Sequence, residues 1–367
     1  MRWIALIACL AAFIGAGVAH ADTPAPPSTD DGATTLPPPL PPALTQVPKA
    51  KPKPPATFTF VGGGDLALAG GADASLLAGI RRFVQPADLA VANLEGTLAT
   101  TGKPHCVPSA ASGCFVFRAS PEWAGVLRGV GWNALNVANN HALDFGTSAQ
   151  LQTLAALRNA RLAYGGLPGQ ITYMHAGAVK VALIGTAPYR WAQSLLDIAA
   201  TQQLVRAAAK RAQVVIVYMH AGAEGSDAGH VLNTFENFLG EKRGNSYAFA
   251  HAMVNAGADL VFASGPHVLR GMEWYRGRLI AYSLGNLAGV HTLAVGGLVS
   301  YSALLRVTLD SRGRFVLGSV VPLRLVRTGT PRFDPSGASL RLIQTLSRQD
   351  FGTRGARIAG SGRISPP

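Results

Sequence analysis

The residues best suited to chemistry lie between Gly131 and Gly146, where an apolar run ends in Asn139-Asn140-His141 and Asp144 follows. Residues 134–137 have the composition of a short buried strand, and a helical pattern begins at Gly146. Two carboxamides, an imidazole and a carboxylate pack poorly in a core, but they can bind ions and transfer protons. Open α/β sheets hold their ligands beyond the carboxyl ends of their strands. This run therefore predicts an active-site loop.

Polar residues of metal-binding types follow several other short apolar runs. They are Asp65 after residues 58–61, Glu95 after 89–92, Asn140 and His141 after 134–137, His220 after 214–219, and His267 after 260–263. One polar residue at a strand end is ordinary, but five such positions together indicate a shared site. Mixed carboxylate, carboxamide and imidazole ligands suit divalent cations such as Mn, Zn, Mg or Fe.

Each residue also has a simpler interpretation when it is taken alone. Asp65 could cap a turn after three glycines, and Asn140 could bond the backbone of its own loop. Glu95 could satisfy free amides at the start of a helix. His220 could be a hydrogen-bonded core histidine, and His267 could be a turn residue after a proline.

The elements that would position these residues follow from the hydrophobic periodicity. Further apolar runs of strand length include residues 179–184, and helical periodicity predicts helices over residues 75–84, 121–128, 148–158, 195–211 and 248–256. Two late hairpins are expected, one around Arg276-Gly277 and one around residues 310–313. Strands that alternate with helices before late hairpins favour an α/β sandwich.

Six short motifs occur along the chain in a recognisable order. They are Gly64-Asp65-Leu66, Ala92-Asn93-Leu94-Glu95-Gly96, Ala138-Asn139-Asn140-His141-Ala142-Leu143-Asp144, His220-Ala221-Gly222-Ala223-Glu224, Gly265-Pro266-His267-Val268 and Tyr282-Ser283-Leu284-Gly285-Asn286. Together they resemble the bacterial capsule-synthesis protein family CapA, of the poly-γ-glutamate type, over roughly residues 57–325. That family is similar to the calcineurin-like metallophosphoesterases. The resemblance implies a four-layer α-β-β-α sandwich with a metal centre at the strand ends.

The resemblance also implies a role for each matching residue. Asp65 and His267 would bind a first metal, Asn140 and His220 would bind a second, and Glu95 would bridge both. His141 would be the proton donor or would contact a phosphate. The residues around these ligands would be Asn93, Asp144, Glu224 and Asn286, of which Asp144 and Glu224 would orient imidazoles.

Two positions depart from the pattern of related proteins. Ala67 stands where metallophosphoesterases usually carry a histidine two residues after the first aspartate, an absence usual in the CapA-like branch. Ser264 and Gly265 stand where many relatives carry one or two histidines before the Pro-His pair. The second metal would then lack a strong ligand, so we expect either one or two ions.

Two functions from different classes are compatible with these residues. The first is metal-dependent hydrolysis or transfer at a phosphoryl or acyl centre, in which His141 protonates the leaving oxygen. It would serve the synthesis, release or anchoring of an anionic capsule or envelope polymer. The alternative is a non-catalytic polymer-binding or assembly protein that retains the metallophosphoesterase scaffold, and Ser264 and Gly265 favour it.

The N-terminus has the features of a secretory signal peptide. Arg2 precedes an apolar stretch from Ile4 to Val18, and Ala19-His20-Ala21 supplies small residues at both positions of a cleavage site. We therefore expect an exported protein that resides in the periplasm or cell envelope after cleavage near Ala21.

Composition divides the rest of the chain. Residues 22–56 are rich in proline and predict an extended linker. Residues 57–350 are expected to form the folded domain, and residues 351–367 a flexible tail. With 48% hydrophobic but only 7% aromatic residues, the core should consist mainly of Ala, Val, Leu and Ile.

Two cysteines remain once Cys9 is removed with the signal peptide. Cys106 and Cys114 bracket a short loop rich in Ser, Ala and Pro. In an oxidising compartment such a pair is typical of a local disulfide. A metal thiolate site is the alternative, but the chain has no further cysteine to complete it.

The chain carries a formal net charge of +13, and residues 306–363 contain eleven arginines but only three aspartates. This excess is either an ordinary solvated surface or an attraction for an anionic polymer, lipid head group or cell-wall component. Export and the absence of a basic segment with interleaved aromatic residues argue against nucleic acid. We expect an anionic polymer or envelope component as the partner, and other capsule-synthesis membrane proteins as further partners.

Overall fold

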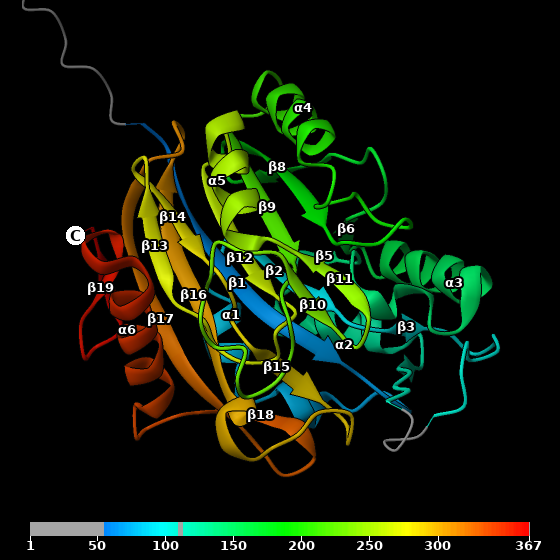
Figure 1. Cartoon of the computed structure of the whole chain (residues 1–367). Coiled ribbons are helices and arrows are strands. Elements are labelled where there is room, and N and C mark those ends of the chain that lie inside the picture. The colour runs from blue at the N-terminus through cyan, green and yellow to red at the C-terminus, as the bar shows by residue number, and fades with distance from the viewer. Residues whose placement is uncertain (1–54, 109–112, 367) are drawn as a thin grey trace, which may run out of the picture. The chain divides into compact units, whose positions relative to one another are not determined.

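The computed structural model describes residues 55–108 and 113–366 (Figure 1). The expected signal peptide, and the linker before residue 55, lie outside these residues. Within the described residues no helix is both long and apolar enough to cross a membrane.

A ten-stranded mixed sheet forms one half of the domain. Its strand order is β19-β20-β17-β16-β1-β2-β5-β6, while β15 pairs with β1 and β18 with β17. The strands are β1 (Thr57–Ala67), β2 (Leu89–Leu94), β5 (Ala134–Asn136), β6 (Ala163–Gly165), β15 (Asn286–Gly289), β16 (Tyr301–Asp310), β17 (Phe315–Val326), β18 (Thr330–Phe333), β19 (Arg357–Ile358) and β20 (Arg363–Ser365). Strands β1, β2, β5 and β6 are mutually parallel, so their carboxyl ends meet at one edge.

A six-stranded sheet forms the other half, in the order β13-β14-β12-β9-β8-β7. Its strands are β7 (Thr172–Ala176), β8 (Val179–Thr186), β9 (Val214–His220), β12 (Leu260–Ser264), β13 (Met272–Tyr275) and β14 (Arg278–Ala281). Strands β8, β9, β12 and β14 run parallel, so this sheet also gathers its carboxyl ends at one edge.

The side chains of a strand point alternately to its two faces, which explains why both sheets are covered on two sides. In β9, Val214, Ile216 and Tyr218 belong to the core between the sheets, which also contains Phe60 and Phe262. The intervening Val215, Val217 and Met219 belong to a separate core with helices α4 (Ile198–Ala209) and α5 (Ser246–Ala256). Because strand side chains alternate between faces, a strand apolar at every position needs two apolar partners.

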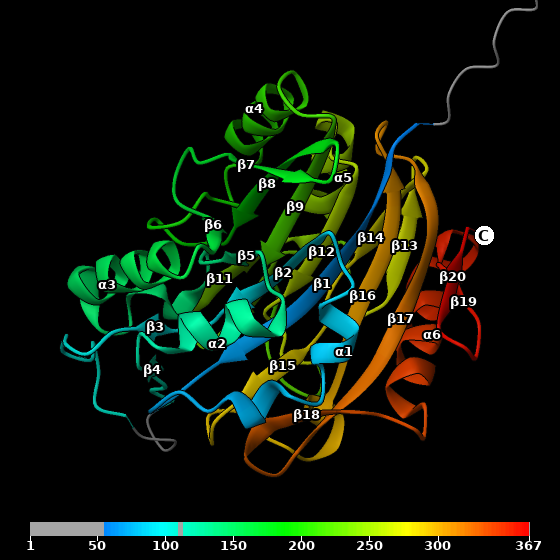
Figure 2. The ribbon, with the colours of Figure 1, turned by 180° about the vertical axis from the view of Figure 1, so that it is seen from behind.

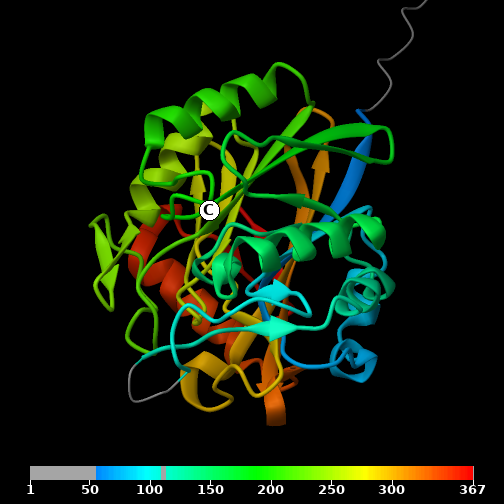
Figure 3. The same ribbon diagram turned by 90° about the vertical axis from the view of Figure 1, so that its right-hand side faces the viewer.

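The ten-stranded sheet buries its outer face in the same way. Its strands pack against helices α1 (Arg81–Val84), α2 (Trp123–Val130) and α3 (Gly146–Asn159) through a third core. Figure 2 shows α1 and α2 in front of the sheet, and Figure 3 shows α5 on one side of the strands with α1 and α2 on the other. The expected α/β fold with layers α-β-β-α is therefore confirmed, and its cores are mostly Ala, Val, Leu and Ile.

Two expectations about local structure were wrong, and the first concerns the helix expected after β1. The predicted helix over residues 75–84 is divided into a 3-10 turn, η1 (Ala74–Leu77), and the short helix α1. Gly79 lies at the break, where a Cβ atom would be only 3.1 Å from the carbonyl oxygen of Pro331. Glycine is a poor helix former, and here its missing side chain lets β18 approach.

The C-terminal residues are not a flexible tail. After helix α6 (Ala338–Phe351) the chain makes a 3-10 turn, η6 (Gly352–Arg354), and then adds β19 and β20 to the ten-stranded sheet beside β17. Ile364 is buried in the core between the sheets, and Trp274 Nε1 donates a 3.0 Å hydrogen bond to the Ser365 carbonyl. The few apolar residues of this polar segment are thus sufficient to anchor it.

Candidate metal centre

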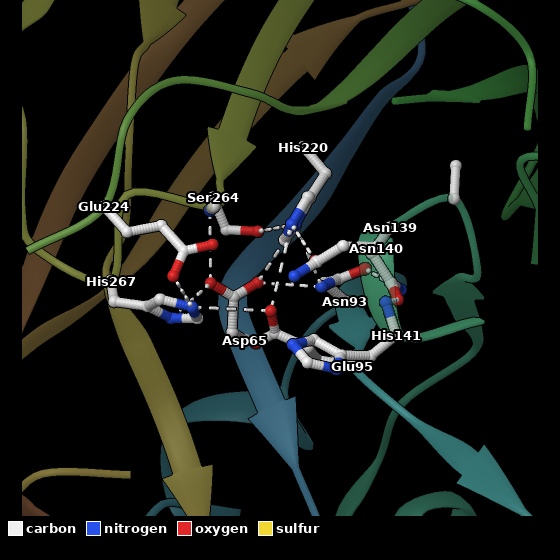
Figure 4. Close-up of polar contacts among 12 residues, drawn as sticks. Asp65, Asn93, Glu95, Asn139, Asn140, His141, His220, Glu224, Ser264 and His267 are labelled. Atoms are coloured by element: carbon white, nitrogen blue, oxygen red, sulfur yellow. Dashed lines mark hydrogen bonds and ion pairs between the residues drawn. The ribbon is translucent and has the colours of Figure 1, made fainter. Parts of the chain in front are cut away.

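The candidate site lies at the carboxyl ends of strands from both sheets. Register places Asp65 beside Asn93 in β1 and β2, and Asn93 beside Asn136 in β2 and β5. In the other sheet Ser264 lies beside His220. The five residues expected to bind metal, and the asparagines around them, come together there (Figure 4).

Asn93 is the centre of a buried carboxamide network. Its Nδ2 donates to Asp65 Oδ1 at 2.8 Å, while its Oδ1 accepts from Asn136 at 2.8 Å and from Asn139 at 3.1 Å. Asn139 also donates to the Leu94 carbonyl and accepts from the His141 amide. Among the described residues Asn136 Oδ1 has no hydrogen-bond partner, but the side-chain amides of both Asn93 and Asn139 are bonded. These bonds fix the geometry of Asp65 and of the loop that carries Asn140 and His141.

His220 lies between the two sheets and is completely buried. Its Nε2 is 3.0 Å from Asn140 Oδ1 and 3.8 Å from Glu95 Oε1, while its Nδ1 is 3.6 Å from Asp65 Oδ1. Two atoms that share one ion at about 2.1 Å lie about 3.0 to 3.4 Å apart. The Asn140 and His220 atoms have that spacing.

Asn286 determines which nitrogen of His267 carries the proton. Asn286 Nδ2 donates to the Val299 carbonyl, so its Oδ1, 2.7 Å from His267 Nδ1, must accept from that nitrogen. In the neutral imidazole the lone pair is then on Nε2. That nitrogen is 3.5 Å from both Glu95 Oε1 and Glu224 Oε2. His267 Nε2, Glu95 Oε1 and Glu224 Oε2 are therefore three electron-pair donors that face one another.

Glu95 provides the strongest sign that a cation belongs here. Its side chain is completely buried, and within the part of the chain that the structure describes neither carboxylate oxygen has a hydrogen-bond partner. A buried ionised carboxylate without a partner is expensive. Asp65, Glu95, His220 and His267 thus form a donor set that fits one or two divalent cations of the Mn, Zn, Mg or Fe type.

The pKa values of the buried residues reflect the same charge imbalance. Burial, followed by the charges of Asp65 and Glu224, raises the pKa of Glu95 well above its ordinary value. Burial alone would also raise the pKa of Asp65, but bonding to His220 and the positive charges of His220 and His267 lower it to about 2. Burial lowers the pKa of His220 despite the attraction of Asp65. A neutral imidazole at His220 and an ionised carboxylate at Asp65 are the states that bind metals.

His267 occupies a strained backbone conformation. Its φ is 58°, in the left-handed region that favours glycine, and the preceding Gly265 has a φ of 114°. Such conformations in other residues persist where the surrounding structure enforces them. Here the turn directs the Gly265 amide to Asp65 Oδ2 at 3.1 Å, and it brings His267 Nδ1 within 3.5 Å of the same oxygen.

Asp144 positions His141 at the open side of the site. Asp144 Oδ2 is 2.9 Å from His141 Nδ1 and accepts a 2.6 Å hydrogen bond from the Phe117 amide. This bonding leaves His141 Nε2 available for proton exchange. The expected role of Asp144 in orienting an imidazole agrees with this geometry.

Glu224 has a different place from the one expected. The residue that orients His267 is Asn286, whereas Glu224 faces the Nε2 side of the ring. Its other oxygen forms a 2.7 Å ion pair with Arg243, whose side chain is buried. Arg243 donates further to the Gly222 carbonyl at 3.0 Å and to Tyr189 at 3.1 Å.

Sequence reasoning missed Arg243, the buried cation of the site. It lies in β11 (Glu241–Gly244), which forms a two-stranded sheet with β10 (Glu236–Phe238). Neither strand carries a recognisable motif or an apolar run, so no local signal distinguished Arg243 from the surface arginines. Asn136 was missed too, although a polar residue at the end of an apolar strand was a usable signal.

The two positions where relatives carry histidines have other contacts here. Ser264 Oγ is 3.4 Å from His220 Nδ1 and accepts a 2.6 Å hydrogen bond from Tyr218. A Cβ atom at Gly265 would lie 2.9 Å from the Ala221 nitrogen, so that position has no room for a side chain. The chain therefore supplies a hydroxyl and a backbone amide at these two positions.

Cys106 and Cys114 are joined in a disulfide, with their Cα atoms 6.3 Å apart. Residues on both sides of the disulfide are hydrogen-bonded to Asp144, because the His105 amide donates to the Asp144 carbonyl and the Phe117 amide to its side chain. The disulfide thus lies directly beside the His141–Asp144 pair.

A two-sheet sandwich with carboxylates, imidazoles and carboxamides gathered at its strand ends has the ligand types of a divalent-cation site. The family comparison is more specific. The model of the family described as bacterial capsule synthesis protein PGA_cap matches residues 59–289, and the chain belongs to this family.

Individual relatives are more distant. The chain is 28% identical over 225 residues to the capsule biosynthesis protein CapA of Bacillus anthracis. The matched region covers 58% of this chain and about half, 53%, of that protein. It is 27% identical over 308 residues to a Mycobacterium tuberculosis protein named "Probable polyglutamine synthesis accessory protein", covering 73% of this chain and 74% of that one. The crystal structure of a 5'-nucleotidase precursor from Thermus thermophilus is 14% identical with a TM-score of 0.40, covering 81% of this chain and 60% of that chain.

Proposed function

We propose that this protein acts in the synthesis, release or anchoring of an anionic capsule or envelope polymer of the poly-γ-glutamate type, through metal-dependent hydrolase or transferase chemistry. Membership of the capsule-synthesis family supports the role in a polymer pathway. The buried donor set supports the chemistry, because it combines carboxylates and imidazoles, which are ligand types of divalent cations.

Five residues would hold the cation or cations: Asp65, Glu95, Asn140, His220 and His267. The bound metal would supply Lewis acidity at a phosphoryl or acyl oxygen and would lower the pKa of water. The other residues position these groups. Asn93 holds Asp65, Asn286 sets the proton on His267 Nδ1, and Arg243 offsets the charge of Glu224.

His141 would act as the general acid. Its Nδ1 is bonded to Asp144, and it lines the cavity above the site, so Nε2 can give a proton to a leaving oxygen. General acids held at a fixed position typically contribute about 10²- to 10⁴-fold to rate.

The observation that carries the proposal is Glu95. Its Oε1 lies 3.8 Å from His220 Nε2 and 3.5 Å from His267 Nε2, and neither of its carboxylate oxygens has a hydrogen-bond partner among the described residues. The test measures metal content by plasma mass spectrometry and hydrolysis of an aryl phosphodiester. We expect at least one bound divalent ion and measurable turnover. His141→Ala should keep the metal and lose about 100-fold or more in turnover. Full metal content with unchanged turnover in this variant would contradict the role of His141.

A non-catalytic polymer-binding or assembly protein is the second candidate. Ser264 and Gly265 favour it, because they put a hydroxyl and a backbone amide where many relatives offer imidazoles. This candidate predicts no turnover in protein supplied with Mn, Zn, Mg or Fe. It also predicts that retention of an anionic polymer on a column survives the loss of Glu95.

We also propose export, with cleavage near Ala21 and residues 22–56 as a tether for the domain. The A-x-A pattern and the apolar stretch before it support this proposal. Mass spectrometry of the mature protein from its host tests it, since an N-terminus at Asp22 is expected and an uncleaved chain in the cytoplasm would refute it.

A further inference from the structure

One face of the candidate centre is apolar. A cavity of about 270 Å³ opens directly on the side chains of His141, His267, Glu224 and Asn286. The remainder of its wall is mainly hydrophobic, with Phe115, Phe117, Phe238, Leu293, Ala294 and Val299. Polar donors and an apolar wall therefore share one space.

Three separate segments contribute this wall. Phe115 and Phe117 follow the disulfide, Phe238 ends β10, and Leu293 and Val299 lie in the segment after β15. Phe115 is 49% exposed and Phe238 is half-buried, so these rings are not needed to fill the core. Large apolar side chains at the mouth of a site are often there to bind a ligand.

Phe117 connects the apolar wall to the proton donor. Its ring centroid is 4.3 Å from that of His141, and its amide bonds the Asp144 carboxylate that holds His141. The group that protonates a leaving oxygen must lie next to that oxygen. The apolar wall is thus on the side of the leaving group.

We propose that the site cleaves phosphate esters whose leaving alcohol is apolar, with Phe115, Phe117 and Phe238 as the surfaces that bind it. This inference rests on the proposed function and narrows its substrate class. A polar polymer backbone gains nothing from phenyl walls, so the apolar part is the alcohol rather than the polymer.

The proposed reaction is a hydrolysis of the bond between phosphorus and the leaving oxygen. A water oxygen forms a bond to phosphorus, and the bond between phosphorus and the leaving oxygen breaks with its electron pair on that oxygen. The leaving oxygen takes the proton from His141 Nε2, and the attacking water releases one proton to solvent. For a phosphodiester substrate, the products are a phosphate monoester and an apolar alcohol.

The size of the cavity agrees with this class of substrate. A dry cavity of about 150 Å³ is sufficient for one benzene ring. A space of about 270 Å³ can therefore hold a ring, or a short branched aliphatic segment, together with the atoms around phosphorus. Aromatic and aliphatic alcohols share the chemistry that this wall recognises, and the probes below separate them.

Binding of three phosphonates tests the inference without relying on turnover. Methyl-, phenyl- and n-octylphosphonate differ only in the apolar group attached to phosphorus. We expect calorimetry on the Mn²⁺-loaded protein to show phenyl- or octylphosphonate binding at least tenfold more tightly than methylphosphonate. The tighter of the two identifies an aromatic or an aliphatic alcohol, and the same ratio is expected in the metal-free protein.

Substitutions in the cavity wall test which residues produce the preference for apolar phosphonates. Phe115→Ala and Phe238→Ala should reduce it about threefold to tenfold each, with unchanged affinity for methylphosphonate. Phe235→Ala is the matched control, because Phe235 is 51% exposed just before β10 and does not line the cavity. Thermal unfolding checks that each variant is folded.

Two results would overturn the inference. Equal affinities for the three phosphonates, or no binding of any, would remove the apolar subsite, and so would an equal loss in Phe235→Ala. The proposed function fails separately. A preserved preference for apolar phosphonates without turnover of any phosphodiester would reject the hydrolase chemistry and keep the apolar subsite. Turnover without that preference would keep the hydrolase chemistry and reject the subsite.

Discussion

Asp144 holds His141 through a 2.9 Å contact between Oδ2 and Nδ1, and the two residues are only one helical turn apart in the chain. The same carboxylate oxygen accepts the Phe117 amide at 2.6 Å. One side chain thus ties the proton donor to the segment that follows the disulfide.

Asp144→Asn should reduce kcat about 10- to 100-fold while metal content stays constant. The amide oxygen can still accept both bonds that Asp144 Oδ2 now accepts. The substitution removes the negative charge beside His141, however, so the bond that holds the imidazole is no longer charge-assisted and the ring is held less firmly. The measurement is kcat across pH for an aryl phosphodiester. His105→Ala is the control, since the His105 side chain is more than half exposed and its Nδ1 is 3.8 Å from the Asp144 carboxylate, while the backbone bond from the His105 amide is kept. An equal loss in both variants would point to general damage to the loop.

Glu95→Gln should stabilise the metal-free protein at pH 7 to 8 and have little effect near pH 4. Burial, with the charges of Asp65 and Glu224, raises the pKa of Glu95 in the folded state. The stability that this protonation provides is complete below the unfolded pKa of about 4.3 and is lost as pH rises through the raised folded value. The neutral amide avoids that loss, which we expect to be about 1 to 3 kcal/mol.

Thermal unfolding with EDTA and with added Mn²⁺ measures both halves of this prediction. Metal should reverse the order of stability, because only the carboxylate gains strongly from binding an ion. A wild-type protein that is more stable than Glu95→Gln at pH 8 in EDTA would contradict the view that the carboxylate is uncompensated.

Glu224→Gln should cost about 2 to 3 kcal/mol of unfolding free energy. Among the described residues, the change leaves the buried Arg243 guanidinium with Glu241 as its remaining carboxylate partner, 3.4 Å away and half exposed. Loss of a buried ion partner outweighs the relief of repulsion between Glu224 and Glu95. Urea denaturation measures the difference. Glu241→Gln, which removes the exposed partner, should cost less than about 1 kcal/mol, and a larger cost there would mean that Glu241 is the main partner of Arg243.

Ile364→Ala should destabilise the domain by about 2 to 4 kcal/mol, as expected for a large-to-small change in a core. Ile364 is 2% exposed and lies in β20 within the core between the sheets. Arg363→Ala in the same strand is exposed and should change stability by less than about 0.5 kcal/mol. Equal and small effects would indicate that the C-terminal strands contribute little to the fold.

Local signals were sufficient for much of the scaffold. The buried strands β8, β9 and β12 were predicted because each contains a run of mostly apolar residues, interrupted in β8 by Lys180, and such runs depend only on neighbouring residues. Most residue types at the strand ends were predicted for the same reason, although Asn136 was missed. Parallel strands bring Asp65, Asn93 and Asn136 to one edge.

The sequence by itself therefore determined the alternation of strands and helices and the residues at the strand ends, because both are written in short stretches of chain. Only the tertiary structure decided how the two sheets face each other. That packing brings the Gly265 amide to Asp65, 200 residues away, assigns Asn286 rather than Glu224 to orient His267, and buries Arg243 from a strand with no motif. It also forms the apolar cavity from three separate segments and holds the polar C-terminus in the sheet. These features depend on contacts between residues far apart in the chain. The free energy of such contacts cannot be read from the pattern of neighbouring residues.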